Sequence, residues 1–228
     1  MSTLAEQVVE QLKTDMDNVY DAGYQKGKSE GGGSYYDTFW DTFQKNGTQD
    51  EYRYAFAYQW NDNIYKPKYK IKPPRELIYT YFNSNITSVG TELDTSDCVD
   101  LYYSFCGSKI KTIQSLDCSK CTSFARTFST CGELISLTLN NLLKTATFEN
   151  TFDYCQKLET FLVSGEIGNA INLQWSGLLT VESVQSLINA LADLTGQTTQ
   201  TLTFHADVKA KLTDEQIATI TSKNWTLA

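Results

Sequence analysis

The sequence has little histidine, proline or methionine: its 228 residues include one His, three Pro and two Met. With His205 as the only imidazole, general acid–base or metal chemistry built on histidine is disfavoured. Basic residues are not in excess either, because 19 Lys and Arg are outnumbered by 27 Asp and Glu, which gives a net charge of −8. Polyanion-binding proteins normally carry a basic field. The composition therefore predicts no nucleic-acid partner and no anionic membrane surface as the main partner.

Signals for membrane insertion and export are also lacking. No run of 18 apolar residues occurs, so we expect no membrane insertion. The first thirty residues carry six acids and lack the basic region and the apolar segment of a secretory signal, so no signal peptide is expected. Six cysteines in such a chain are expected to be reduced thiols and not a disulfide framework.

What is present begins with an amphipathic pattern over residues 1–27. Leu4, Val8, Leu12 and Val19 recur every four or seven residues, as on one face of a helix. Two interpretations remain open, a packed amphipathic helix and a short coiled coil. The second predicts a homo-oligomer such as a trimer, or docking on a partner protein. Residues 28–34 are rich in Gly and Ser, which predicts a flexible linker.

Aromatic residues, 13% of the chain, are dense in residues 35–75, which we predict to be an N-terminal cap. From 52 to 60 they alternate with smaller or polar residues, which predicts a strand with one aromatic face. That face is either a platform on which sugar rings stack or a surface buried against the next domain. Large aromatic side chains are more often buried in this way. The candidate ligand-binding residues of this face are Tyr52, Tyr54, Tyr58 and Trp60.

A repeat of 24 residues runs from 76 to 169. Three columns of apolar residues keep this period, and four cysteines follow it. Such periods are typical of solenoids, whose units bury their apolar faces only against their neighbours. The columns are Phe82, Phe105, Phe128 and Phe152; Ile86, Ile110, Leu134 and Leu158; Val89, Ile113, Leu137 and Phe161; and the pairs Cys98/Cys121 and Cys131/Cys155. Each repeat is expected to form a turn or short helix at the Phe, followed by a strand, and the cysteines to be buried small apolar groups.

Residues 170–228 predict two helix-then-strand units that close the array. Thr180 precedes an amphipathic pattern through Leu194 that Gly196 is expected to end, and 201–204 follow as a strand. Thr213 opens a capping box for a second helix, and Trp225 to Leu227 form the last strand.

The repeats resemble a known family. The patterns Phe128-x-x-Cys131-x-x-Leu134-x-x-Leu137-x-Leu139 and Phe152-x-x-Cys155-x-x-Leu158-x-x-Phe161-x-Val163 resemble the BspA-like leucine-rich repeats of bacterial surface and phage-associated proteins in gut Firmicutes and their prophages. The resemblance covers about residues 35 to 228. It implies an α/β solenoid fold, and it says little about function because such repeats present surfaces. In the first repeat the pattern departs, since the step from Phe82 to Ile86 is two residues shorter than that from Phe128 to Leu134.

Two motifs match catalytic or metal-binding patterns in form only. Residues 22–29 satisfy a relaxed phosphate-loop pattern but lack the buried strand before it and the helix after it. Cys118 and Cys121 form a C-x-x-C without the second close pair that a zinc site needs. We therefore assign no catalytic, cofactor-binding or metal-binding residue, and we expect no enzyme and no cofactor.

Together these observations predict a recognition or structural protein. The resemblance implies a phage or prophage tail component, such as a fibre or receptor-binding protein, located in the virion. The alternative is a cell-surface adhesin of the same repeat family, located on the bacterial surface. Either would bind a cell-surface protein or glycan, and the exposed tyrosines of the repeats, Tyr102 and Tyr103, join the candidate ligand-binding residues.

Overall fold

The structure is a computed structural model that describes residues 76–89 and 93–228. The chain divides into two units, Met1–Thr48 and Gln49–Ala228, and every described residue belongs to the second. The predicted helix over 1–27, the linker over 28–34 and the cap over 35–75 therefore lie outside the described residues. The same holds for the candidate residues Leu4, Val8, Leu12 and Val19, and for Tyr52, Tyr54, Tyr58 and Trp60.

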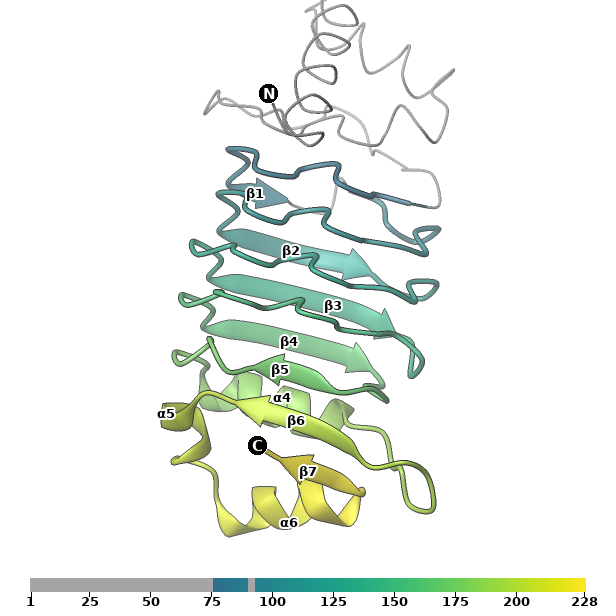
Figure 1. Cartoon of the computed structure of the whole chain (residues 1–228), viewed down its shortest axis with the longest axis vertical. Coiled ribbons are helices and arrows are strands. Elements are labelled where there is room, and N and C mark those ends of the chain that lie inside the picture. Colours follow the sequence, from purple (N-terminus) through teal and green to yellow (C-terminus); the bar gives the residue numbers. More distant parts are fainter. Residues whose placement is uncertain (1–75, 90–92) are drawn as a thin grey trace, which may run out of the picture. The chain divides into compact units, whose positions relative to one another are not determined.

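Two small parallel sheets and three helices make up the described part (Figure 1). The first sheet has the order β1-β2-β3-β4, and the second has the order β5-β6-β7. The strands are β1 (Ser88–Val89), β2 (Thr112–Asp117), β3 (Ser136–Leu142), β4 (Thr160–Gly165), β5 (Ile171–Leu173), β6 (Gln200–Phe204) and β7 (Trp225–Leu227). The helices are α4 (Val181–Ala190), α5 (Ala206–Lys209) and α6 (Asp214–Ser222).

The register of the first sheet reproduces the 24-residue period. Val89 pairs with Ile113, Ile113 with Leu137, and Leu137 with Phe161. All four are buried, as are the four residues that lie three positions before them, so two of the predicted columns are confirmed. A second set of parallel bridges joins Glu76 to Asp100, then Ser123, then Thr147. We number four repeats from these bridges: 76–99, 100–122, 123–146 and 147–170.

Opposite the strands, each repeat crosses back through a chain of overlapping tight turns, which we call the turn ribbon (77–84, 101–108, 124–131 and 148–155). Its backbone N–H groups alternate between two kinds of acceptor. In the second repeat, Ser104 N donates to Leu101 O within the repeat, at 3.0 Å, whereas Tyr103 N donates to Ala125 O of the next repeat, at 3.1 Å. This alternation satisfies the backbone without a regular strand or helix. It also ties every repeat to its neighbour on both sides of the core.

A stack of aromatic rings runs through the core under the turn ribbon. The rings of Phe105 and Phe128 are stacked with centroids 5.7 Å apart, and those of Phe128 and Phe152 with centroids 5.8 Å apart. The predicted first member, Phe82, is wrong. Tyr81 holds that place, stacked on Phe105 at 5.0 Å, while Phe82 is half-buried and contacts Tyr79 and Tyr103 by its edge.

Small polar side chains beside the rings form two further columns. In one, a buried hydroxyl donates to the previous repeat: Thr127 Oγ1 reaches Leu101 O at 2.8 Å. In the other, the thiols of Cys131 and Cys155 donate to Phe105 O and Phe128 O at 3.0 and 3.1 Å. The expected burial of the repeat cysteines is confirmed, and their S–H groups also link one repeat to the next.

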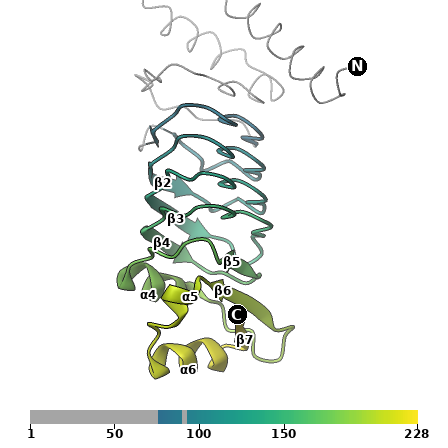
Figure 2. The same cartoon turned by 60° about the vertical axis from the view of Figure 1, so that its left-hand side comes forward.

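Helix α4 covers the open edge of β4, so the first sheet ends there. Ser183 Oγ accepts from Phe161 N at 2.9 Å and donates to Glu159 O at 2.9 Å. Ser186 Oγ accepts from Val163 N and donates to the carbonyl of the same residue. Two hydroxyls thereby satisfy backbone groups that a further strand would bind, which protects an otherwise exposed edge. In Figures 1 and 2, α4 continues the side of β2–β4 while β5 continues the side of the turn ribbons.

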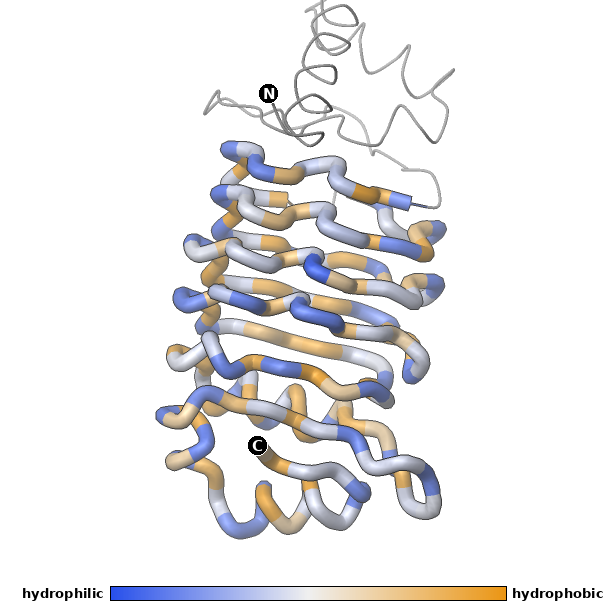
Figure 3. Tube along the Cα trace, viewed as in Figure 1, coloured by the Kyte–Doolittle hydropathy of each residue, from blue (hydrophilic) through white to orange (hydrophobic). Residues whose placement is uncertain are grey.

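The two helices and two strands predicted for residues 170–228 occur in the predicted order, but β5 and α5 were not predicted, and α4 differs in two details. The capping box of Thr213 and Gln216 is present, and β6 and β7 fall where strands were predicted. Helix α4, however, ends at Ala190 and not at Gly196, because the chain becomes extended at Leu191 and pairs there with Ile167. Lys223 Nζ donates to the carbonyls of Ile188, Asn189 and Leu191 at this end. Val181 also faces solvent and not the core. Figure 3 shows hydrophobic residues recurring in every layer of the array.

Candidate binding surface

The turn ribbon of the first two repeats carries a cluster of aromatic side chains. The rings of Tyr79 and Tyr103 are stacked, with centroids 4.9 Å apart, and Tyr102 meets Tyr103 edge to face at 4.6 Å. Tyr102 is 36% exposed, although a ring of that size usually lies deeper. The structure therefore brings together Tyr102 and Tyr103, the two described residues among the predicted ligand-binding set.

Local backbone geometry places these rings. The turns of the ribbon need a left-handed residue at their third position, where Gly or Asn is favoured. Gly107 and Asn83 meet this need, but Tyr79, Tyr103 and Tyr154 adopt φ of 56°, 54° and 60°. An ordinary residue in this conformation costs about 1–2 kcal/mol relative to the right-handed region. Three tyrosines thus occupy positions at which the backbone conformation favours glycine.

Arg126 extends the cluster into the third repeat. Its guanidinium carbon lies 5.5 Å from the centroid of the Tyr103 ring, within cation–π range. Electrostatic interaction with Tyr103, together with a hydrogen bond to its hydroxyl, raises the pKa of Arg126. The side chain is exposed, so its donors remain accessible to other groups.

A second aromatic pair lies further along the ribbon. The rings of Tyr154 and Trp175 are stacked, with centroids 4.3 Å apart and planes at 24°. Tyr154 belongs to the fourth repeat, and Trp175 follows β5 in the next layer. Its neighbour Ser176 donates to Cys155 O, which fixes this segment beneath the ribbon. Tyr154 is 51% exposed, the most exposed aromatic side chain of the described residues.

Asp153 precedes Tyr154 in the chain and is half-buried. Burial raises the pKa of its carboxyl, and the charge of Arg126 lowers that pKa in part. We call Tyr102, Tyr103, Arg126, Asp153, Tyr154 and Trp175 the aromatic strip.

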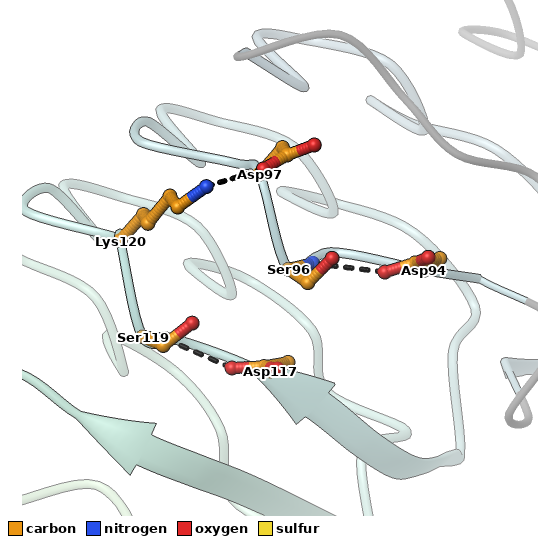
Figure 4. A network of polar contacts seen from close by, with 6 residues as sticks. All are labelled: Asp94, Ser96, Asp97, Asp117, Ser119 and Lys120. Carbon is orange, nitrogen blue, oxygen red and sulfur yellow. Dashed lines mark hydrogen bonds and ion pairs between the residues drawn. The ribbon is translucent and has the colours of Figure 1, made fainter.

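Polar groups at the far ends of the strands have structural roles. Figure 4 shows Asp94 and Asp117 each accepting from the backbone N–H two residues later, at Ser96 and Ser119. Burial raises the pKa of Asp117, but hydrogen bonds from Ser119 and Asn141 outweigh it and lower that pKa. Lys120 pairs with Asp97 between the two turns. These bonds hold equivalent turns of neighbouring repeats together.

The thiols show no sign of reactivity. Burial raises the pKa of Cys98 and of Cys131 to about 12, and it raises those of Cys118 and Cys121 further. A reactive thiol needs a lowered pKa and access to solvent. Cys118 and Cys121 are instead buried, with their S–H groups bonded to backbone carbonyls.

Within residues 76–89 and 93–228, no three His, Cys, Asp or Glu side chains lie in a group that could hold a metal ion, and no helix is long and apolar enough to cross a membrane. His205 caps α5, accepting from Asp207 N at 3.1 Å, and its ring packs on Gly177. These contacts give His205 a structural role.

Comparison of the chain with known protein families, with curated proteins and with solved structures finds no match. The leucine-rich-repeat class and the BspA-like family therefore stay predictions.

Sequence analysis missed Arg126, Asp153, Tyr154 and Trp175. Arg126 could have been found by writing the repeats in register, because it shares one column with Tyr79 and Tyr103. The column of Tyr154 carries Asn83, Gly107 and Thr130 in the earlier repeats, so it predicts no aromatic residue there. Trp175 lies beyond the last regular repeat, where the spacing drops to 21 residues, so no column points to it.

Proposed function

We propose that this chain is a non-enzymatic recognition protein of the leucine-rich-repeat kind, acting as a phage or prophage tail-associated component, a fibre or receptor-binding protein. In this proposal the turn ribbon binds a molecule on the cell surface, and the N-terminal residues attach the repeats to the virion. The aromatic strip is the observation that carries the proposal. It combines the exposed rings of Tyr102 and Tyr154 with the exposed side chain of Arg126 on a backbone held by hydrogen bonds within and between repeats.

Rigidity and exposure together support binding over a purely structural role for the strip. The backbone of the ribbon is fixed by hydrogen bonds within and between repeats, so rings held on it lose little entropy when a ligand binds. Aromatic and Arg side chains at such sites contribute most of the energy in recognition surfaces. A ring needed for packing alone would gain nothing from the exposure of Tyr102 or Tyr154.

Two measurements test the proposal. Mass spectrometry of purified virions and of uninfected cell envelopes should find the protein in the virions; finding it only in uninfected envelopes favours the adhesin. Labelled full-length protein should bind host cells, and Tyr102→Ala combined with Tyr103→Ala should reduce that binding about tenfold or more. Ile135→Ala, with a similar exposure of 38%, is the matched control and should bind as wild type. Undiminished binding by the double variant would refute the role of the strip.

A further inference from the structure

The backbone ladder that joins the turn ribbons stops after the fourth repeat. In each of the first three repeats, four N–H groups of the ribbon donate to carbonyls of the next repeat, at 2.7 to 3.1 Å. The equivalent N–H groups of the fourth repeat have no acceptor among the described residues. They belong to Phe148, Asn150, Phe152 and Tyr154. We call the boundary between this ribbon and the layer of β5 the seam.

Side chains replace backbone bonds at the seam on both sides of the core. On the ribbon side the contacts are a ring pair and two side-chain hydrogen bonds, of which Asn169 Nδ2 to Ala146 O, at 3.0 Å, is the shorter. On the strand side, α4 bonds to β4 through two serine hydroxyls. Within residues 76–89 and 93–228, a single backbone–backbone hydrogen bond crosses the seam, from Thr180 N to Glu159 O at 2.9 Å. The seam is therefore the weakest backbone connection between the layers that the structure describes.

Residues 167–228, which we call the lid, are by contrast firmly tied to one another. Parallel ladders join β5 to β6 and β6 to β7, and a bridge joins Ile167 to Leu191. Near the end of the chain, Lys223 Nζ donates to three carbonyls at the end of α4. These bonds connect the first elements of the lid to the last, so we expect the lid to move as one body.

We propose that the lid opens from the repeats as one unit, about the chain between β4 and Ile167, while the repeats stay folded. In an array whose layers touch only their neighbours, the free energy of unfolding is close to a sum of layer and interface contributions, so the weakest interface opens first. Such openings of part of a structure are general in folded proteins. Leu187 and Ile188 of α4 are fully buried, so apolar packing holds the lid closed and the open state is the minor one.

Opening of the lid uncovers backbone groups at the edge of the first sheet. The edge of β4 loses the hydroxyls of Ser183 and Ser186, which leaves Phe161 N and Val163 N able to pair with another strand. The lid is thus a conformational device that hides an open sheet edge. This inference concerns the C-terminal end of the array and does not depend on the proposed recognition function.

Native-state hydrogen exchange of the full chain tests the proposal, followed by NMR at urea concentrations below those that unfold the protein. Amides in the ladders of β6 and β7 should share one opening reaction and exchange about tenfold or more faster than amides of β2 and β3, whose exchange requires the repeats to open as well. Equal exchange rates with an equal dependence on urea in the two groups would mean that the array is a single cooperative unit, and would overturn the proposal.

Two substitutions give an independent measurement. Phe128→Leu disturbs the stacked rings inside the repeats, which stay packed when the lid opens. It should therefore speed the exchange of β2 and β3 about tenfold and leave the lid amides within about twofold of wild type. Ser183→Ala weakens the closed lid, and because the lid opens before the repeats, it should speed both groups by the same factor. If Phe128→Leu speeds the lid amides as much as those of β2 and β3, the lid does not open separately and the proposal fails.

Discussion

Replacing Ser183 by Ala removes the hydroxyl that satisfies the edge of β4 at its most buried point. Both Phe161 and Ser183 are fully buried, so no water can replace the lost partner of Phe161 N. A buried donor left without a partner costs about 1–3 kcal/mol. The better helix propensity of Ala returns a few tenths of that. We expect the free energy of unfolding to fall by about 2 kcal/mol.

Ser186→Ala is the matched control, because it makes the same change one turn later in the same helix. Ser186 bonds to Val163, which is only half-buried, so water can take its place. The lost hydrogen bond and the gained propensity should nearly cancel, and the expected change is within about 0.5 kcal/mol of zero.

Urea denaturation followed by circular dichroism gives both free energies, and amide hydrogen exchange shows whether Phe161 N loses protection in Ser183→Ala alone. Equal effects of the two substitutions would contradict the reasoning, since burial is the only difference it uses. So would a Ser183→Ala protein as stable as wild type, which would mean that α4 closes the sheet by apolar packing alone.

Three further predictions concern the interior. The buried thiols have folded-state pKa values raised above their ordinary 9.0, to about 12 for Cys98 and Cys131, so the unfolded chain ionises first. These thiols should not affect the free energy of unfolding below about pH 8.5, and they should lower it as the pH rises from there toward 12. Urea midpoints measured at each pH test this, and a flat profile would contradict the burial of the thiols. Gly165→Ala should destabilise by about 3 kcal/mol or more, because φ is +99° and a Cβ would lie 2.3 Å from Leu142 O. Thermal melting should show this, and a melting temperature equal to wild type would refute it. Among the described residues, Ser84 Oγ is the one buried side-chain nitrogen or oxygen atom without a hydrogen-bond partner. The same column carries Cys in the third and fourth repeats, so Ser84→Cys should raise the free energy of unfolding, measured in urea, by about 1 kcal/mol. A destabilised variant would mean that the hydroxyl of Ser84 has a role.

The columns of the repeat could be predicted because each apolar position must face the core in every layer. Ile110, Leu134 and Leu137 are therefore buried where their period places them. Position Phe82 shows where this argument stops. Tyr81 is the neighbouring residue and is also aromatic, so hydrophobicity alone does not predict which of the two rings is buried in the core. The alternating hydrogen bonds of the turn ribbon decide this, because they fix which residue points inward.

The end of α4 and the aromatic strip depend on contacts that are distant in sequence. Helix α4 ends where Leu191 pairs with Ile167, and Lys223, 32 residues after Leu191, donates to the carbonyl of Leu191; the local sequence predicts neither contact. Likewise Tyr154 and Trp175 meet only because β5 takes the side of the ribbon while α4 takes the side of the strands. The two tyrosines of the strip that were predicted, Tyr102 and Tyr103, are adjacent in sequence, so no long-range contact was needed to find them.

The closure of β4 by α4 also bears on how such a chain could change its length during evolution. A duplicated unit inserted between the third and fourth repeats would meet the same turns, rings and thiol–carbonyl bonds on both faces. A unit added after β4 would separate Phe161 from Ser183 and would need two new hydroxyls at the right places on the helix. Growth of the array by duplication is therefore expected among the repeats before β4. The segment from β4 onward should be inherited as one piece.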